Sequence, residues 1–184
     1  MITDILYDQY RITGKLTGHV NLRLLLSNRG FRRLYYYRKM RESQGLCLAI
    51  FRFLNYLLHK KMSVELPRSV KLGKGALLLH PYSITFNTTC VIGDNVTILK
   101  GATIGESKTG KIGSPIIGNN VYIGLNSTVV GNIHIGNDVM IAPNTFVNFD
   151  VPDGALVLGS PGVIHEKEKA SKLYISNSIL DINL

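Results

Sequence analysis

The stretch IGNNVYIGLNSTVVGNIHIGNDVMIAPNTFV, residues 117–147, decides the fold, because an aliphatic residue returns at every sixth position. Those positions are Ile117, Ile123, Val129, Ile135, Ile141 and Val147. The period also holds within two earlier sets, which are Ile92, Ile98 and Ile104, and Leu72, Leu78 and Ile84. An α-helix repeats every 3.6 residues and a strand every two, so neither element explains a period of six.

Each six-residue unit is expected to form a short strand and a tight corner, so that three units complete one triangular coil. The six-spaced aliphatic residue then points inward and stacks on its equivalents in neighbouring coils. Corners need residues that tolerate positive φ, as Gly and Asn do. Asparagines stand at the expected corners, at Asn87, Asn95, Asn119, Asn120, Asn126, Asn137 and Asn144. The period predicts about four coils over residues 70–148, or about five with a partial coil at Leu66.

The period breaks twice before residue 117. The step from Ile84 to Ile92 is eight residues and the step from Ile104 to Ile117 is thirteen. The longer break is expected to extrude residues 106–115 as a loop, and long loops on a regular scaffold are often functional. The repeat domain is predicted to span residues 63–165, and residues 166–184 are predicted to form a weakly ordered tail.

Residues 1–62 are predicted to form a separate α-helical domain. Residues 32–40 and 45–61 have helical spacing, and Gly30 is expected to mark a turn between two helices. Apolar residues of the second helix share one broad stripe, formed by Leu46, Ile50, Phe53, Leu54 and Leu57. This stripe is expected to pack against the first coil. The alternative is that the helix lies at a membrane interface.

The net charge of +9 comes entirely from the helical domain. Residues 1–62 carry twelve Lys and Arg against three Asp and Glu, whereas residues 63–184 carry nine of each. The surplus indicates either a solvated helical face or an acidic partner such as a membrane surface or an anionic glycan. Nucleic acid is not expected, because Tyr35, Tyr36 and Tyr37 are consecutive and cannot share one helix face, and no base-reading motif is present.

The cysteines and the apolar segments bear on the compartment. Cys47 and Cys90 are isolated, so they predict neither a disulfide framework nor a metal site. The apolar run over residues 46–58 is interrupted by Arg52 and Asn55 and is too short to span a bilayer. No signal-peptide pattern is seen at the N-terminus. We therefore expect a cytoplasmic protein, including a location at the inner face of the membrane.

Beyond the period, several stretches resemble one family. They are the block around Asn-Arg-Gly-Phe at residues 28–31, GKGALLLH at 73–80, CVIGDNVTI at 90–98, GATIG at 101–105, VVGNIHIG at 129–136 and GSPGVI at 159–164. The chain resembles the hexapeptide-repeat acyltransferases, which are left-handed parallel β-helices, and within them the serine O-acetyltransferase branch. The resemblance covers about residues 20–165 and is most specific in the Gly-x-Gly stretch that ends in His80.

The resemblance implies a catalytic pair. His80 matches the family's general base, which takes the proton of an acceptor hydroxyl as that hydroxyl attacks the thioester of acetyl-CoA. Histidine suits this step because it can accept and release a proton near neutral pH. Glu65 stands fifteen residues upstream, where family members usually have Asp, and is expected to orient the imidazole.

The resemblance also implies where acetyl-CoA binds. The matching residues are Gly105, Gly124, Leu125, Ala142, Pro143, Ser160 and Pro161. Lys108 and Lys111 of the extruded loop are expected to meet the anionic coenzyme. The alternative for the groove positions is a role in coil geometry alone, and the alternative for the two lysines is a solvated loop. The family forms trimers with the coenzyme between neighbouring solenoids, so a homotrimer is expected. No metal takes part in the implied mechanism.

Departures from the branch concern the acceptor. Leu79 replaces the usual Asp before the catalytic histidine, and Ser114 replaces a histidine in the extruded loop. A site without those charges is poorly suited to a zwitterion. The expected acceptor is therefore a hydroxyl of a sugar or surface-polysaccharide precursor, with Leu79, Tyr82 and Ser114 on the acceptor side. Serine is the alternative acceptor, and a non-catalytic repeat scaffold is the second alternative.

Overall fold

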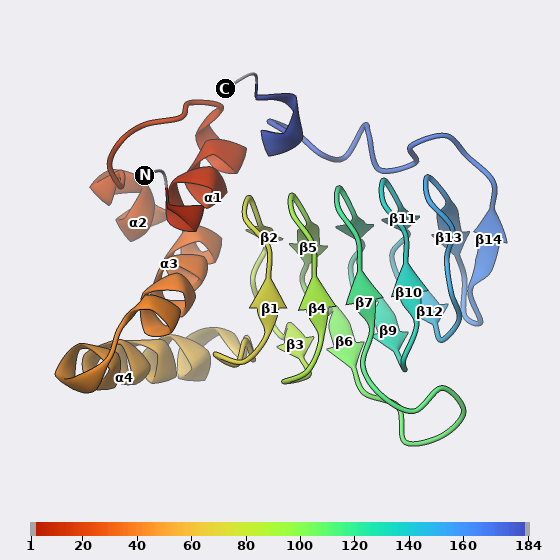
Figure 1. Ribbon diagram of the computed structural model, residues 1–184, viewed down its shortest axis with the longest axis horizontal. Helices are drawn as coiled ribbons and strands as arrows, with labels where there is room; N and C mark the ends of the chain where they lie inside the picture. Colours follow the sequence, from red (N-terminus) through yellow and green to blue (C-terminus); the bar gives the residue numbers. More distant parts are fainter. Residues whose placement is uncertain (1–2, 183–184) are drawn as a thin grey trace.

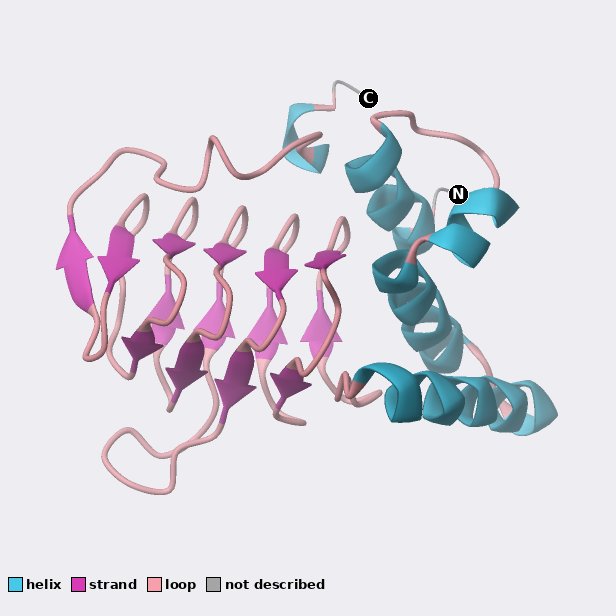
Figure 2. Cartoon of the chain, turned by 180° about the vertical axis from the view of Figure 1, so that it is seen from behind, coloured by secondary structure: helices cyan, strands magenta, loops and turns pink. Residues whose placement is uncertain are grey.

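The computed structural model describes residues 3–182 and has two parts in sequence order (Figure 1). The helical part contains α1 (Asp4–Thr13), α2 (Leu22–Ser27), α3 (Arg29–Glu42) and α4 (Gly45–Met62). The second part is a left-handed parallel β-helix of short strands, and Figure 2 shows it from behind. The predicted fold class is confirmed. No helix among the described residues is both long enough and apolar enough to cross a membrane.

Three parallel sheets form the sides of the β-helix. Sheet 1 contains β1 (Lys71–Leu72), β4 (Val91–Ile92), β7 (Ile116–Ile117) and β10 (His134–Ile135). Sheet 2 contains β2 (Leu77–Leu79), β5 (Thr97–Leu99), β8 (Tyr122–Ile123), β11 (Met140–Ile141), β13 (Leu156–Leu158) and the antiparallel β14 (Val163–His165). Sheet 3 contains β3 (Thr85–Phe86), β6 (Thr103–Gly105), β9 (Thr128–Val130) and β12 (Phe146–Val147).

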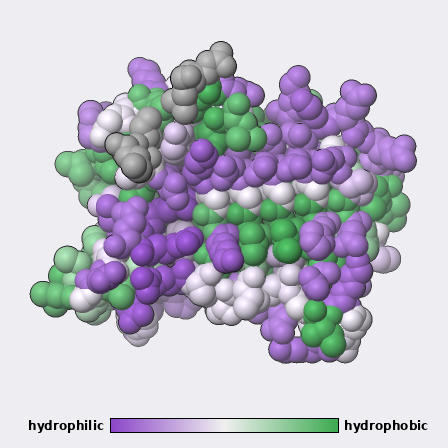
Figure 3. All heavy atoms as spheres, viewed as in Figure 1, coloured by the Kyte–Doolittle hydropathy of each residue, from purple (hydrophilic) through white to green (hydrophobic). Residues whose placement is uncertain are grey.

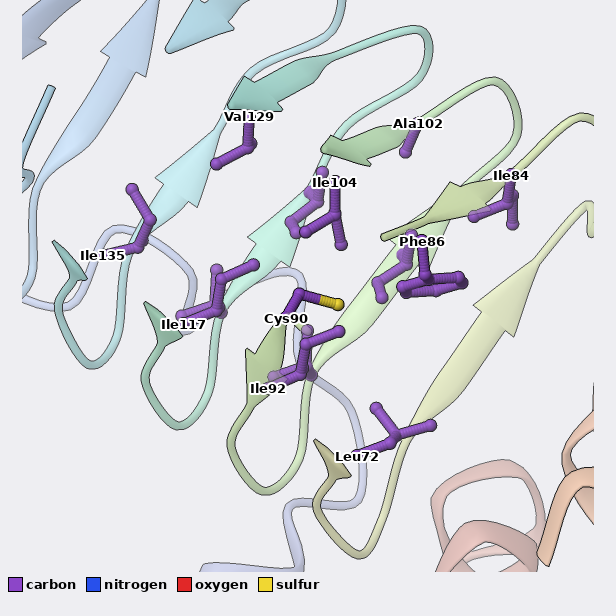
Figure 4. Close-up of a cluster of buried hydrophobic side chains, with 14 of the residues drawn as sticks. Leu72, Ile84, Phe86, Cys90, Ile92, Ala102, Ile104, Ile117, Val129 and Ile135 are labelled. Atoms are coloured by element: carbon purple, nitrogen blue, oxygen red, sulfur yellow. The ribbon is translucent and has the colours of Figure 1, made fainter. Parts of the chain in front are cut away.

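The six-spaced aliphatic residues form the core, as predicted, and all twelve are at most 4% exposed. Figure 4 shows Leu72, Ile92, Ile117 and Ile135 stacked along sheet 1, with a second column behind them. Cys90 belongs to this core, and burial raises the pKa of its thiol to about 12. Stacking of like side chains buries them without any contribution from distant segments.

The first break in the period lies at a different corner from the one the sequence indicates. Phe86, and not Ile84, pairs with Ile104 in sheet 3. The step from Phe86 to Ile92 is therefore the regular six residues, and the two extra residues lie between Leu78 and Phe86. This corner contains His80. The error arose because Ile84 is also fully buried and aliphatic.

The N-terminal turn of α3 also differs from the prediction. Gly30 lies inside the helix rather than in a turn, and the side chain of Asn28 caps the helix by accepting a bond from the N–H of Phe31 at 2.9 Å. A Cβ on Gly30 would lie 2.2 Å from the carbonyl oxygen of Leu78. The glycine is therefore required for close approach of helix and strand.

The helical part covers the open first coil with buried polar side chains. Arg38 donates to the carbonyl oxygens of Leu72 at 2.7 Å and Gly73 at 2.5 Å, and it is paired with Asp8, which is fully buried. Further donors to first-coil carbonyls are Arg33, Tyr37 and Arg11, at 2.6–3.2 Å. These bonds satisfy backbone groups that an open end would leave unpaired.

The C-terminal segment is more ordered than predicted. Residues 166–182 run back along the β-helix toward α1 (Figure 1), and Ile179 in the short 3-10 helix Ile179–Asp181 is buried. The side chain of Arg11 donates to the carbonyl oxygen of Ser176 at 2.9 Å. The prediction of a weakly ordered tail is wrong for these residues, because polar contacts replace the missing apolar pattern. Helix α4 ends at Met62 and β14 ends at His165, and the division into domains at these points stays a prediction.

Candidate active site

His80 lies at the enlarged corner between β2 and β3, with its side chain exposed. Its φ of 50° is in the left-handed region, and its carbonyl accepts a bond from the N–H of Tyr82 at 2.7 Å. Pro81 is buried beneath the corner, so the backbone is supported while the imidazole stays accessible. No hydrogen bond to the imidazole is formed by any residue between 3 and 182. A corner of this kind can present a base to two substrates.

Glu65 lies one coil before the enlarged corner. It forms a parallel bridge with Thr85 of β3, and because Val64 and Leu66 are buried, its side chain points to the outer surface. Within the described chain the carboxylate of Glu65 has no hydrogen bond to His80. The predicted orienting role of Glu65 is therefore untested, and it would require a movement of either side chain.

Strand register places several predicted residues on the same edge of the β-helix as His80. Leu79 pairs with Leu99, and Ile98, Ile123 and Ile141 occupy one column of sheet 2. Extending this register two residues beyond the column stacks one row along the edge, and its members are His80, Lys100, Leu125, Pro143 and Gly159. The N–H of Asn126 donates to the carbonyl of Lys100 at 3.0 Å, and the N–H of Asn144 to that of Leu125 at 2.8 Å.

Small residues allow the coils of this edge to stack closely. A Cβ on Gly124 would lie 2.5 Å from the nitrogen of Pro143 and 2.7 Å from the carbonyl carbon of Ala142. Ala142 is buried, and Ser160 with Pro161, joined by a cis peptide bond, ends the row. The coil-geometry explanation for Gly124 is thus confirmed, while its contact with a coenzyme stays a prediction.

Sequence reasoning missed Lys100, which is exposed in the coil next to His80. It is the cation of this edge, and a free ammonium there suits an anionic part of a substrate. The signal was available in principle, because Lys100 follows Leu99 as His80 follows Leu79. The pairing of Leu78 with Ile98 sets this register, and it does not depend on the enlarged corner.

The remaining predicted coenzyme residues lie at the opposite border of sheet 3. Gly105 pairs with Val130, and the extruded loop begins directly after it. Lys111 forms an ion pair with Asp150, and Lys108 one with Glu106 at 2.7 Å. An open hollow of about 350 Å³ beneath the loop is lined by Lys111, Gly131, Phe146 and neighbouring residues. One chain therefore carries the predicted coenzyme residues on two separate edges.

The predicted acceptor residues are also dispersed. Leu79 is 36% exposed beside His80, and Tyr82 is half-buried with the guanidinium of Arg29 5.6 Å from its ring centroid. Ser114 instead belongs to the base of the loop, where its hydroxyl donates to Asn87 Oδ1 at 2.9 Å. Leu79 and Tyr82 are brought to the His80 corner, whereas Ser114 is held elsewhere by the chain itself.

Comparisons with known proteins agree with this geometry. The family model for bacterial transferase hexapeptide (six repeats) matches residues 114–148. The structure of Neisseria gonorrhoeae serine acetyltransferase in complex with serine is 32% identical, with a TM-score of 0.70, and the match covers 89% of this chain and 68% of that one. The chain belongs to the hexapeptide-repeat serine acetyltransferase family.

Other members of the family support the assignment. Serine acetyltransferase of Staphylococcus epidermidis is 40% identical over 108 residues, which is 57% of this chain and 50% of the relative. The chain thus spans about half the length of the curated relatives it matches. A serine acetyltransferase structure in complex with CoA has a TM-score of 0.69 at 26% identity and covers 88% of this chain and 68% of that one.

Proposed function

We propose that the protein is an acetyl-CoA-dependent O-acetyltransferase in which His80 is the general base. The observation that carries the proposal is the exposed histidine on an enlarged corner, at one end of a row of small and apolar residues. In the proposed step the imidazole takes the proton of an acceptor hydroxyl, and the hydroxyl oxygen bonds to the thioester carbonyl carbon. Collapse of the tetrahedral intermediate releases the CoA thiolate, which takes the proton from the imidazole.

A trimer is the proposed assembly, because the predicted coenzyme residues occupy two borders of sheet 3. In a three-fold assembly the His80 edge of one solenoid can face the loop edge of its neighbour, so one coenzyme contacts both sets. Lys108 and Lys111 would then meet the anionic part of the coenzyme from the second chain. Sedimentation of the protein at the mass of three chains supports this arrangement, and sedimentation as a monomer contradicts it.

L-serine is the first candidate acceptor, because the chain is similar to proteins named serine acetyltransferase and one of the similar structures holds serine. A sugar hydroxyl is the second candidate, and a specific observation favours it. The side chain before His80 is the apolar Leu79, and Ser114 is bound within the loop, so the corner offers few charges for a zwitterion.

A thiol-release assay with acetyl-CoA distinguishes these acceptors. L-serine is compared with a panel of nucleotide sugars and oligosaccharides, and the released CoA thiol is measured. Turnover with serine assigns the first candidate, and turnover only with a glycan acceptor assigns the second. Release with none of the acceptors, at a rate equal to that of a His80→Ala variant, would contradict the proposed activity and favour a non-catalytic scaffold.

A further inference from the structure

Helix α4 carries an apolar stripe that no residue between 3 and 182 covers. Leu46, Ile50, Phe53 and Leu57 follow steps of four, three and four residues, which places them on one face of the helix. They are 77%, 49%, 60% and 47% exposed. The expectation that this stripe packs against the first coil is therefore wrong.

The opposite face of α4 makes the helix's own contacts. Asn55 accepts a hydrogen bond from Arg33 of α3, Leu58 packs against the core cluster and Met62 is buried. The helix lies at the end of the molecule away from the last coil, as Figures 1 and 2 both show. In Figure 3 hydrophobic residues project at this end of the molecule, in groups separated by hydrophilic residues. An exposed apolar face of a helix held by its other face indicates a binding surface.

The charges around the stripe have one sign. Helix α4 contains no Asp or Glu, while Lys60 and Lys61 flank the stripe at its C-terminal end and Arg52 lies on an exposed side. The carboxylates of residues 3–62 are already paired, Asp4 and Asp8 with Arg38 and Glu42 with Lys39. The basic groups of α4 therefore lack an acidic counterpart within this domain.

Two partners could bury the stripe, a second copy of the chain or a lipid surface, and the charges of α4 distinguish between them. Pairing of α4 with α4 of a second copy would bring lysines and arginines together without acidic partners, which disfavours a coiled-coil seam. An anionic lipid surface satisfies both features, because apolar side chains enter the acyl boundary while Lys and Arg reach the headgroups. We propose that α4 lies in the plane of an anionic membrane surface and docks the protein there through Leu46, Ile50, Phe53 and Leu57.

A second helix extends the surface. Leu22 and Leu26 of α2 are 70% and 74% exposed, with Arg23 exposed between them. Both views place α2 at the same end of the molecule as α4. The proposal needs neither catalysis nor the identity of the acceptor, so it stands or falls apart from the proposed function.

Vesicle co-sedimentation of the full-length protein tests the proposal, with phosphatidylcholine vesicles compared with vesicles that also contain phosphatidylglycerol. Binding is expected only with phosphatidylglycerol and is expected to fall as NaCl rises. Replacing Lys60 and Lys61 by Gln should lower partitioning about 25-fold. Phe53→Ser with Leu57→Ser should abolish it, whereas Leu173→Ser, at a tail side chain that is 94% exposed, should not change it.

Circular dichroism and sedimentation of each variant separate lipid binding from folding and assembly. Equal binding to both kinds of vesicle, or unchanged binding of the Phe53 and Leu57 double variant, would overturn the proposal. A third result would also overturn it: the wild-type protein binds neither kind of vesicle, and the double variant has a lower oligomeric mass than the wild type. That result would show that the stripe contacts a second copy of the chain.

Discussion

The two parts of this molecule use their side chains in opposite ways. The β-helix buries aliphatic residues in identical columns and is electrically neutral, whereas the helical part buries charged groups and leaves apolar side chains in water. Asp8, Arg11, Arg33 and Arg38 are all at most 2% exposed, while four apolar residues of α4 are 47% exposed or more. A periodic scaffold can stabilise itself coil by coil, but its first coil needs polar donors from elsewhere.

The largest predicted effect is the loss of acetyl transfer when the imidazole of His80 is removed from the β-helix. His80→Ala is expected to lower acetyl transfer by about 10²–10⁴-fold, because general base catalysis is worth about that factor. The matched control is His134→Ala, which removes another exposed imidazole of the β-helix. The urea midpoint of both variants should stay at the wild-type value. Equal activity of the His80 variant and the control would remove His80 from the mechanism.

The polar junction should be the most sensitive point for stability. Arg38→Met leaves Asp8 buried beside the N–H of Ala76 without its cation, and the expected loss is about 3–5 kcal/mol of unfolding free energy. Urea denaturation measures it. Adding Asp8→Leu should recover part of the loss, because no uncompensated charge is then left. A loss below about 1 kcal/mol, as for an exposed pair, would show that the junction does not hold the two parts together.

Replacing one isoleucine by alanine in the β-helix and one in α4 compares the stability contributions of the two parts. Ile98→Ala removes a fully buried side chain and should cost about 2–5 kcal/mol, because the cavity cannot collapse in a stacked core. Ile50→Ala, at a side chain that is 49% exposed, should change stability by less than about 0.5 kcal/mol. Denaturation of the free protein compares them directly. A large cost at Ile50 would mean that its apolar face is already buried in an assembly.

The smallest expected effect is at the loop. The hydrogen bond from Lys111 lowers the pKa of Asp150 from its ordinary 3.8, so the tether is intact above that pH and is lost as pH falls through the lowered value. Asp150→Asn should raise tryptic cleavage after Lys108 or Lys111 a few-fold at neutral pH. Because the pair is exposed, the unfolding midpoint should not move. Unchanged cleavage would show that Asp150 does not restrain the loop.

Much of the β-helix is readable along the chain because its information is local. All twelve six-spaced residues are buried, and the loop after Gly105 lies where the period breaks. The corner asparagines were read less completely. Positive φ occurs at Asn95, Asn120, Asn126 and Asn144, while Asn119 and Asn137 instead accept hydrogen bonds from backbone N–H groups of the preceding coil, at 2.8 and 2.9 Å. Asparagine stands at all of these corners, but whether it adopts a positive φ or accepts a hydrogen bond depends on the neighbouring coil.

The excess of Lys and Arg in residues 1–62 shows that a charge count does not determine what the basic side chains contact. The count indicates solvation or an acidic partner, but four of the arginines donate to backbone carbonyls of the first coil. The sugar preference inferred from Leu79 and Ser114 stays a proposal, and the comparisons support serine better.

The chain's period of six was enough to determine the coil, its core and the position of the extruded loop, because a repeat contacts mainly its neighbours. Only the tertiary structure decided which corner holds the two extra residues, since Ile84 and Phe86 are equally buried and differ only in their partner strand. It also decided that the stripe of α4 faces outward. Those facts depend on which surfaces meet across many residues, and no local pattern specifies that.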